Sequence, residues 1–167
     1  WDEESVREWN DVRAETKTKN DKAGKEVIKS HVASIMEVNT EKNSELPATD
    51  KRRKLKCRVV YRGDATKDEH GMAAIFNELG SSPATMEATK AADCFGLFPN
   101  HEIQTSDAEM AYTQDKIATT LRNADGNVVQ LETWVRLPRN RWPSHWHGKY
   151  KDPVVRLVLA LYGHPDA

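Results

Sequence analysis

The chain has 167 residues and a formal net charge of −1, with 31% charged and 38% hydrophobic residues. Its mean hydropathy of −0.77 allows a modest hydrophobic core, in one domain or two small lobes. The near-zero net charge excludes a global electrostatic attraction to nucleic acid, so any argument for that partner must be local.

The cysteine content and the lengths of the apolar runs argue against a disulfide-rich protein, a cysteine metal site and a membrane-spanning protein. Cys57 and Cys94 offer neither a disulfide framework nor a metal-ligand spacing, so both are expected to be reduced. No run approaches the ~20 apolar residues of a membrane span, and no signal peptide is visible. The chain opens at Trp1 and ends just after an apolar run, which favours a segment of a longer protein.

The first 50 residues predict a charged helix, a β-branched segment and a loop. Residues 1–26 alternate in charge, and Gly24 can end a helix there. Residues 26–39 are rich in β-branched side chains and predict either a strand or a helix. Residues 40–50, which contain Pro47, are typical of a loop. The residues that form a rough helical stripe at the start are Trp1, Val6, Trp9 and Val12.

A basic run leads into the next predicted strand, which covers Val59, Val60 and Tyr61 and stops at Gly63. Lys56 and Arg58 alternate with Cys57, so they share one face of that strand. The six cations of the run are Lys51, Arg52, Arg53, Lys54, Lys56 and Arg58.

Residues 82–98 predict a helix, with Ser82 at its N-cap and Pro83 at its first position. Pro99 and Asn100 form its stop. The alternation of Ile103, Thr105 and Asp107 then predicts a strand that ends at a carboxylate.

The last third predicts a hairpin and a final apolar element. Asp125-Gly126 is a turn signal between residues 115–123 and a strand over 128–138. Residues 152–163 predict a strand or a buried helix that leads to Gly163. His145 and His147 have no further ligand nearby, so a surface loop anchored by two tryptophans is expected rather than a metal site. These anchors are Trp142 and Trp146.

Five short motifs, in order, resemble copia-type LTR-retrotransposon reverse transcriptases. "KCRVVYRG" is similar to the family's "K-A-R-L-V-A-K-G", and Ser82-Pro83 stands 25 residues before Asp107, close to the family's spacing. "QTSDAEMAYTQ" is similar to "L-D-V-K-T-A-F", with Asp107, Ala111 and Tyr112 at the aspartate, alanine and aromatic positions. "TWVRLP" and "ALYGHPD" resemble "V-Y-M-E-Q-P" and "S-L-Y-G-L-K-Q". The resemblance covers residue 51 to the end.

The resemblance implies an α+β fold, a partial right-hand polymerase in which a mixed sheet is packed with helices. Residues 1–26 would be a charged lead-in, residues 27–100 the fingers and residues 101–167 a truncated palm. The implied activity of the parent protein is RNA-directed DNA synthesis by two-metal nucleotidyl transfer, with Mg²⁺ or Mn²⁺. The implied partners are an RNA or DNA template-primer and deoxynucleoside triphosphates.

Residue roles follow from the same resemblance, each beside an ordinary alternative. Asp107 would be the catalytic, metal-binding carboxylate, or else a plain strand-terminal aspartate. Tyr112 would exclude a 2′-hydroxyl from the sugar pocket, or else be a core aromatic. Lys56 and Arg58 would contact the triphosphate, or else belong to a solvated face.

Three further positions complete the expected nucleotide site. The backbone N–H groups of Met110 and Ala111 would face the triphosphate. Gly163 would allow close approach to the template base pair, or else be a turn glycine. The basic residues before Lys56 are expected in solvent or on the template backbone.

The sequence also departs from the family. His164, Pro165 and Asp166 stand where the family has Leu-Lys-Gln, and the "Y-x-D-D" motif that supplies the other catalytic aspartates is absent from these 167 residues. One carboxylate cannot assemble a two-ion site, so the isolated chain is expected to be inactive. The rival interpretation is therefore a decayed or truncated element product without catalysis, at most a nucleic-acid-binding module.

Overall fold

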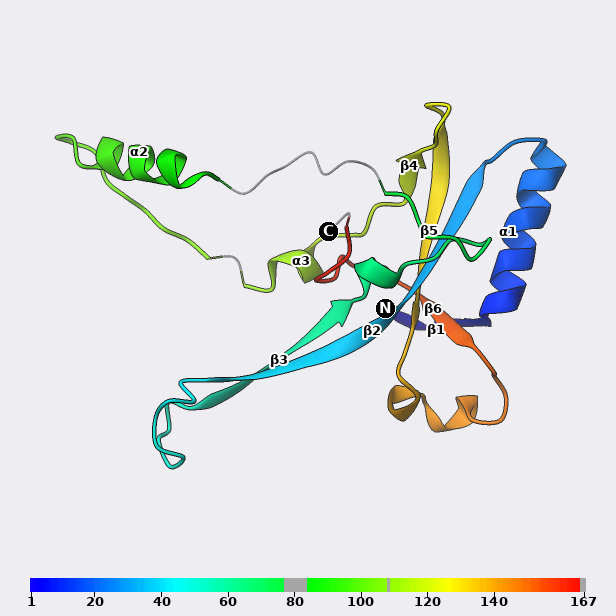
Figure 1. The fold of residues 1–167 in the computed structure, drawn as a ribbon, viewed down its shortest axis with the longest axis horizontal. Helices are drawn as coiled ribbons and strands as arrows, with labels where there is room; N and C mark the ends of the chain where they lie inside the picture. Colours follow the sequence, from blue (N-terminus) through cyan, green and yellow to red (C-terminus); the bar gives the residue numbers. More distant parts are fainter. Residues whose placement is uncertain (77–83, 108, 166–167) are drawn as a thin grey trace.

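The structure, a computed structural model, describes residues 1–76, 84–107 and 109–165. Its centre is a six-stranded mixed sheet with the order β1-β6-β5-β2-β3, in which β4 pairs with β5 beside this path. The strands are β1 (Asp2–Glu8), β2 (Ile28–Lys42), β3 (Lys54–Tyr61), β4 (Thr120–Arg122), β5 (Val128–Arg136) and β6 (Pro153–Arg156). The helices are α1 (Trp9–Ala23), α2 (Met86–Gly96) and the single turn α3 (Ala111–Gln114) (Figure 1). The α+β class expected from the sequence is confirmed at this level.

Strand β2 joins two parts of the sheet. Its first half pairs in parallel with β5, from Ile28 opposite Gln130 to Ser34 opposite Arg136. Its second half pairs antiparallel with β3, from Ile35 opposite Tyr61 to Lys42 opposite Lys54. The division into a fingers region (27–100) and a palm region (101–167) stays a prediction, and this sheet contains strands of both.

The first helix is shorter than the sequence predicted. Residues 2–8 form β1, antiparallel to β6, with Glu8 opposite Pro153. The pattern of apolar residues that predicted a helix here is weak. Pairing with β6 satisfies the backbone N–H and C=O groups of β1, which the first turn of a helix would leave to water. The predicted end is confirmed: Gly24 adopts a left-handed φ of 63° and its N–H donates to the Asp21 carbonyl at 3.1 Å.

The predicted strand over Ile103, Thr105 and Asp107 is wrong, because residues 101–107 have no strand structure. Because its motif should share a site with the motif that follows residues 154–159, this strand was also expected to lie beside the strand there. That strand, β6, already has β1 on one side and β5 on the other, so it offers no edge for this pairing. The segment that runs beside the continuation of β6 comes later in the chain: Ile117 N–H donates to the Val158 carbonyl at 3.1 Å, and Ala160 N–H to the Asp115 carbonyl at 2.8 Å.

The helix predicted after residue 82 begins at Met86, with the Thr85 hydroxyl accepting from the Ala88 N–H at 3.2 Å as its N-cap. The predicted cap at Ser82 and Pro83 lies outside the described residues. None of the α2 residues is buried, and Figure 1 shows this helix apart from the sheet.

Within the described residues, no helix combines the length and apolar character needed to cross a bilayer.

The hairpin predicted around Asp125 and Gly126 is confirmed. Gly126 has φ of 80° and donates to the Asn123 carbonyl at 2.9 Å. The side-chain carbonyl of Asn123 accepts from Asp125 and Asn127 N–H at 3.1 and 2.9 Å. This turn joins β4 to β5.

The two faces of the sheet carry separate cores, because successive strand residues point to opposite sides. Short 3₁₀ turns occur at Gly63–Ala65, Arg139–Arg141 and Ser144–Trp146, and Trp146 from the last of them is buried in the larger core. His145 and His147 beside it are exposed, so the expected surface loop is confirmed. The core under α1 comprises Trp9, Val12, Val32, Trp134 and Val154. The opposite core includes Ala33, Ile35, Tyr61, Val135, Val155 and Trp146.

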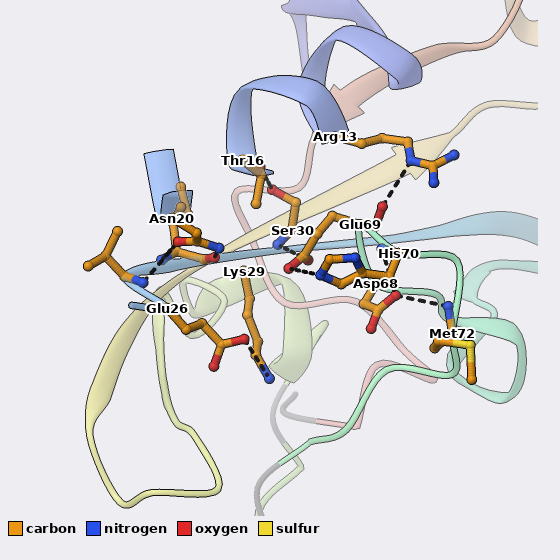
Figure 2. A network of polar contacts seen from close by, with 12 residues as sticks. Arg13, Thr16, Asn20, Glu26, Lys29, Ser30, Asp68, Glu69, His70 and Met72 are labelled. Carbon is orange, nitrogen blue, oxygen red and sulfur yellow. Dashed lines mark hydrogen bonds and ion pairs between the residues drawn. The ribbon is translucent and has the colours of Figure 1, made fainter. Parts of the chain in front are cut away.

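A buried polar network fixes α1 and the 66–74 loop to β2 (Figure 2). Glu69 is 1% exposed, and its carboxylate accepts from the Ser30 N–H at 3.0 Å. The Ser30 hydroxyl lies 2.7 Å from that of Thr16. Arg13 Nε donates to the Glu69 carbonyl at 2.9 Å. These bonds hold three separate segments in register on one face of the sheet.

Candidate functional site

A cavity of about 680 Å³ lies along the free edge of β3. The strand contributes four consecutive residues, the 107–113 segment contributes four more, and Tyr162 and Trp1 complete much of the wall. Because the cavity follows the strand edge, side chains from both faces of β3 reach it. The four strand residues are Lys56, Cys57, Arg58 and Val59.

Lys56 and Arg58 are the cations of this wall. They lie opposite Thr40 and Val38 of β2, and both are exposed. Two other cations of the basic run are occupied within the chain: Arg52 pairs with Asp50 at 2.8 Å and Arg53 with Glu41 at 2.7 Å. Within the described residues Lys56 and Arg58 have no ion pair, which leaves both charges available to an anionic ligand.

Tyr162 links Arg58 to Tyr112. The Arg58 guanidinium carbon lies 5.7 Å from the centre of the Tyr162 ring, within the range of a cation–π contact. The Tyr112 ring centre lies 4.5 Å from that of Tyr162. Tyr112 is 41% exposed and is absent from the residues that line the cavity. The ring that faces the cavity is therefore Tyr162, which the sequence reasoning did not single out.

The acidic wall comes from residues 107–113, which begin at the end of the segment that was wrongly predicted to be a strand. Asp107, Glu109, Met110 and Thr113 line the cavity. Met110 has φ of 53°, a left-handed conformation unusual for a side chain of its size, and its carbonyl accepts from Thr113 N–H at 2.9 Å. The tight turn at Met110 leads directly into α3, which Ala111 begins. Asp107 and Glu109 thereby share one cavity with Lys56 and Arg58.

Gly163 lies against the end of β3, at Val60 and Tyr61. It has φ of 82°, and a Cβ there would collide with the Tyr61 carbonyl oxygen and lie 2.7 Å from Val60 Cγ1. Tyr61 N–H donates to the Tyr162 carbonyl at 2.7 Å. The glycine lets the C-terminal segment approach the end of β3 closely, which holds the Tyr162 ring at the cavity.

The donor chemistry suits a hard cation in part. Mg²⁺ is usually bound by one or two carboxylates together with substrate phosphates and water, and Asp107 and Glu109 supply two carboxylates beside one cavity. Within the described part of the chain, however, there is no group of three or more His, Cys, Asp or Glu side chains placed to hold a metal ion. The residues therefore fit an ion that arrives with a polyphosphate better than a resident metal centre.

Of the residues predicted from the sequence, the cavity brings together Lys56, Arg58, Asp107 and Met110. Ala111, Tyr112 and Gly163 adjoin it through the α3 turn and the Tyr162 segment. The sequence reasoning missed Glu109, Trp1 and Tyr162. Glu109 stands two residues after Asp107, which is a usable signal, whereas no local pattern places Trp1 beside residues more than 50 positions away.

Comparisons with protein families, with curated proteins and with solved structures found no match.

Proposed function

We propose that this cavity binds the triphosphate of a deoxynucleoside triphosphate with Mg²⁺, as part of the fingers and partial palm of a copia-type RNA-directed DNA polymerase. One observation carries the proposal. Four residues that the resemblance selects, Lys56, Arg58, Asp107 and Met110, come from segments about fifty positions apart and line a single cavity.

The charge arrangement supports a polyphosphate ligand. The planar Arg58 guanidinium can donate two parallel hydrogen bonds to phosphate oxygens, and Lys56 adds a second positive charge on the same strand. Asp107 and Glu109 would hold the ion that neutralises the remaining phosphate charge. The volume of about 680 Å³ lies within the range of small-molecule pockets.

The cavity-facing ring gives Tyr162 a role beside that proposed for Tyr112. Its contact with Arg58 orients the guanidinium, and the Tyr112 ring packs against it. In this arrangement Tyr162 would meet the sugar or base first, and Tyr112 would limit how far that ring can move.

A second candidate is a nucleotide-binding or nucleic-acid-binding module without catalysis. It is favoured by the shortage of carboxylates, because the described residues assemble no group of three ligands and a two-ion reaction requires a fuller set. Both candidates predict nucleotide binding, so binding is the property to measure first.

The test is calorimetric titration of the chain with dTTP in Mg²⁺. Arg58→Ala is expected to weaken binding by about tenfold or more, the loss typical of a charge-assisted hydrogen bond. Lys54→Ala is the matched control, because Lys54 is an exposed cation on the same strand and is absent from the cavity lining. Asp107→Asn should remove most of the dependence on Mg²⁺.

Equal losses for Arg58→Ala and Lys54→Ala would show that only diffuse positive charge matters, and the proposal would be rejected. A Mg²⁺ dependence that survives Asp107→Asn would remove that carboxylate from the site.

A further inference from the structure

A second cavity, of about 340 Å³, lies among the start of α1, the middle of β2 and the 65–71 loop. It shares no lining residue with the cavity along β3. Three cationic side chains and one carboxylate line it: Arg13, Lys67, Arg136 and Asp152.

One of the three cations is neutralised by the carboxylate. Arg136 Nε and Nη2 donate to the two Asp152 oxygens at 2.7 and 2.8 Å, and the Arg136 guanidinium carbon lies 5.8 Å from the centre of the Trp9 ring. The Asp152 N–H also donates to the Glu8 carboxylate at 2.9 Å. This ion pair forms a fixed, neutral part of the wall.

Arg13 is held so that most of its guanidinium remains available. Its Nε donates to the Glu69 carbonyl at 2.9 Å, and Figure 2 shows the two terminal nitrogens directed away from that carbonyl. Arg13 has no ion pair within the described residues. The single backbone contact fixes the guanidinium without neutralising it, which leaves its terminal nitrogens able to donate to an oxyanion.

Lys67 supplies the second uncompensated charge from the facing loop. Its backbone is fixed to β2, with hydrogen bonds of 2.8 and 2.9 Å to Val32. Its side chain has no carboxylate partner in the described part of the chain. The residues that line the cavity therefore carry two more positive than negative charges, in a protein whose net charge is −1. The two uncompensated cations come from two segments that the Glu69 network holds together.

We propose that this second cavity is a phosphate-binding site that recognises the phosphate group itself. Trp9 is only 5% exposed and Arg136 covers its ring, so no aromatic face is offered to a base. The ligand is a phosphate oxyanion, supplied either by a free pyrophosphate or by the backbone of a nucleic acid. The inference does not depend on the function proposed for the β3 cavity.

Inorganic pyrophosphate is the probe, titrated calorimetrically in EDTA into the Arg58→Ala variant so that the first cavity contributes little. Lys67→Glu is expected to weaken binding at least tenfold. Lys25→Glu is the matched control, since Lys25 is also exposed and has no ion pair within the described residues. Ala65→Glu, which adds a carboxylate to the cavity wall without altering Arg13 or Lys67, should have the same effect as Lys67→Glu. Circular dichroism verifies that each variant is folded.

A second titration with a twelve-residue oligothymidylate distinguishes the two sources of phosphate. If Lys67→Glu weakens both ligands, the site accepts backbone phosphates; if it weakens pyrophosphate alone, the ligand is a free anion. The proposal is overturned if folded Lys67→Glu and Ala65→Glu variants bind pyrophosphate as tightly as the Lys25→Glu control, or if the starting protein does not bind it.

Discussion

Two buried histidines should make the fold sensitive to mild acid. His31 is 1% exposed and His164 is 5% exposed, and both rings contact Phe76, with centres 5.1 and 5.4 Å away. Burial lowers the pKa of His31 to about 4, helped by the positive charge of Lys29 and opposed by Asp68. Burial also lowers the pKa of His164 to about 4, and the charge of His31 acts in the same direction.

The direction of the effect follows from proton uptake. In the unfolded chain both imidazoles take up protons as pH falls through about 6.5, whereas in the folded chain they stay neutral until about pH 4. The unfolded state therefore binds more protons between these values, and stability falls as pH is lowered through this window. Below about pH 4 both states are protonated and the histidine contribution levels off.

The expected loss in the free energy of unfolding is large relative to the stability of a typical small domain. Each tenfold difference in proton affinity corresponds to about 1.36 kcal/mol, so lowering the pH from 7 to 5 removes about 2 kcal/mol for each histidine and about 4 kcal/mol for the pair. Small domains are typically stable by about 5–15 kcal/mol.

Urea unfolding at pH 7, 6 and 5, followed by fluorescence of the five tryptophans, measures this loss. His31→Gln should reduce the loss between pH 7 and 5 to about 2 kcal/mol, whatever it does to stability at pH 7. His145→Gln, at an exposed position, is the control and should keep the full loss. A wild-type stability that is flat from pH 7 to 5, or a full loss in His31→Gln, would refute the reasoning.

The remaining predictions concern the close backbone approach at residue 163 and the buried carboxylate. Gly163→Ala should lower the free energy of unfolding by about 2 kcal/mol more than Gly126→Ala, because both glycines have positive φ but only at Gly163 would a Cβ strike a neighbouring backbone; similar losses in urea unfolding would contradict this. Glu69→Ala should cost about 1–3 kcal/mol by leaving the buried Ser30 N–H without its acceptor. Glu69→Gln, which keeps an acceptor oxygen, should cost less, and the reverse order would be inconsistent with the network.

Short sequence patterns correctly predicted those elements whose structure depends on the backbone preferences of a few neighbouring residues. The left-handed glycine that ends α1 and the Asp125-Gly126 turn follow from residue-specific backbone preferences, and β3 follows from β-branched residues before a glycine. The whole 26–39 segment remained ambiguous between strand and helix from sequence, because β-branched residues alone do not show which neighbouring segments will pair with it.

The other parts of the fold depend on pairing between segments that lie far apart in the sequence. β1 exists because β6, about 150 positions later, accepts it, and residues 103–107 could not pair with β6 because both of its edges are already paired. In the candidate site, Lys56, Arg58 and Asp107 could be selected from their motifs. Glu109 could have been found from its place two residues after Asp107. Trp1 and Tyr162 could not be placed beside these residues, because a cavity wall is set by how separate segments fold back on one another.

The two halves of β2 are held by different numbers of neighbours, and the half beside the β3 cavity has fewer. Its first half is clamped between β5 and the Glu69 network, whereas its second half pairs with β3 alone and, with β3, extends from the body as a two-stranded ribbon (Figure 1). An isolated ribbon of this kind is only marginally stable in water, and Lys56 and Arg58 lie on it. The base of the ribbon is buried at Ile35 and Tyr61, whereas residues 54–58 of β3 are exposed. Bending of this exposed part would move the two cations relative to Asp107, so we expect the width of the cavity to change more readily than the packing of the core.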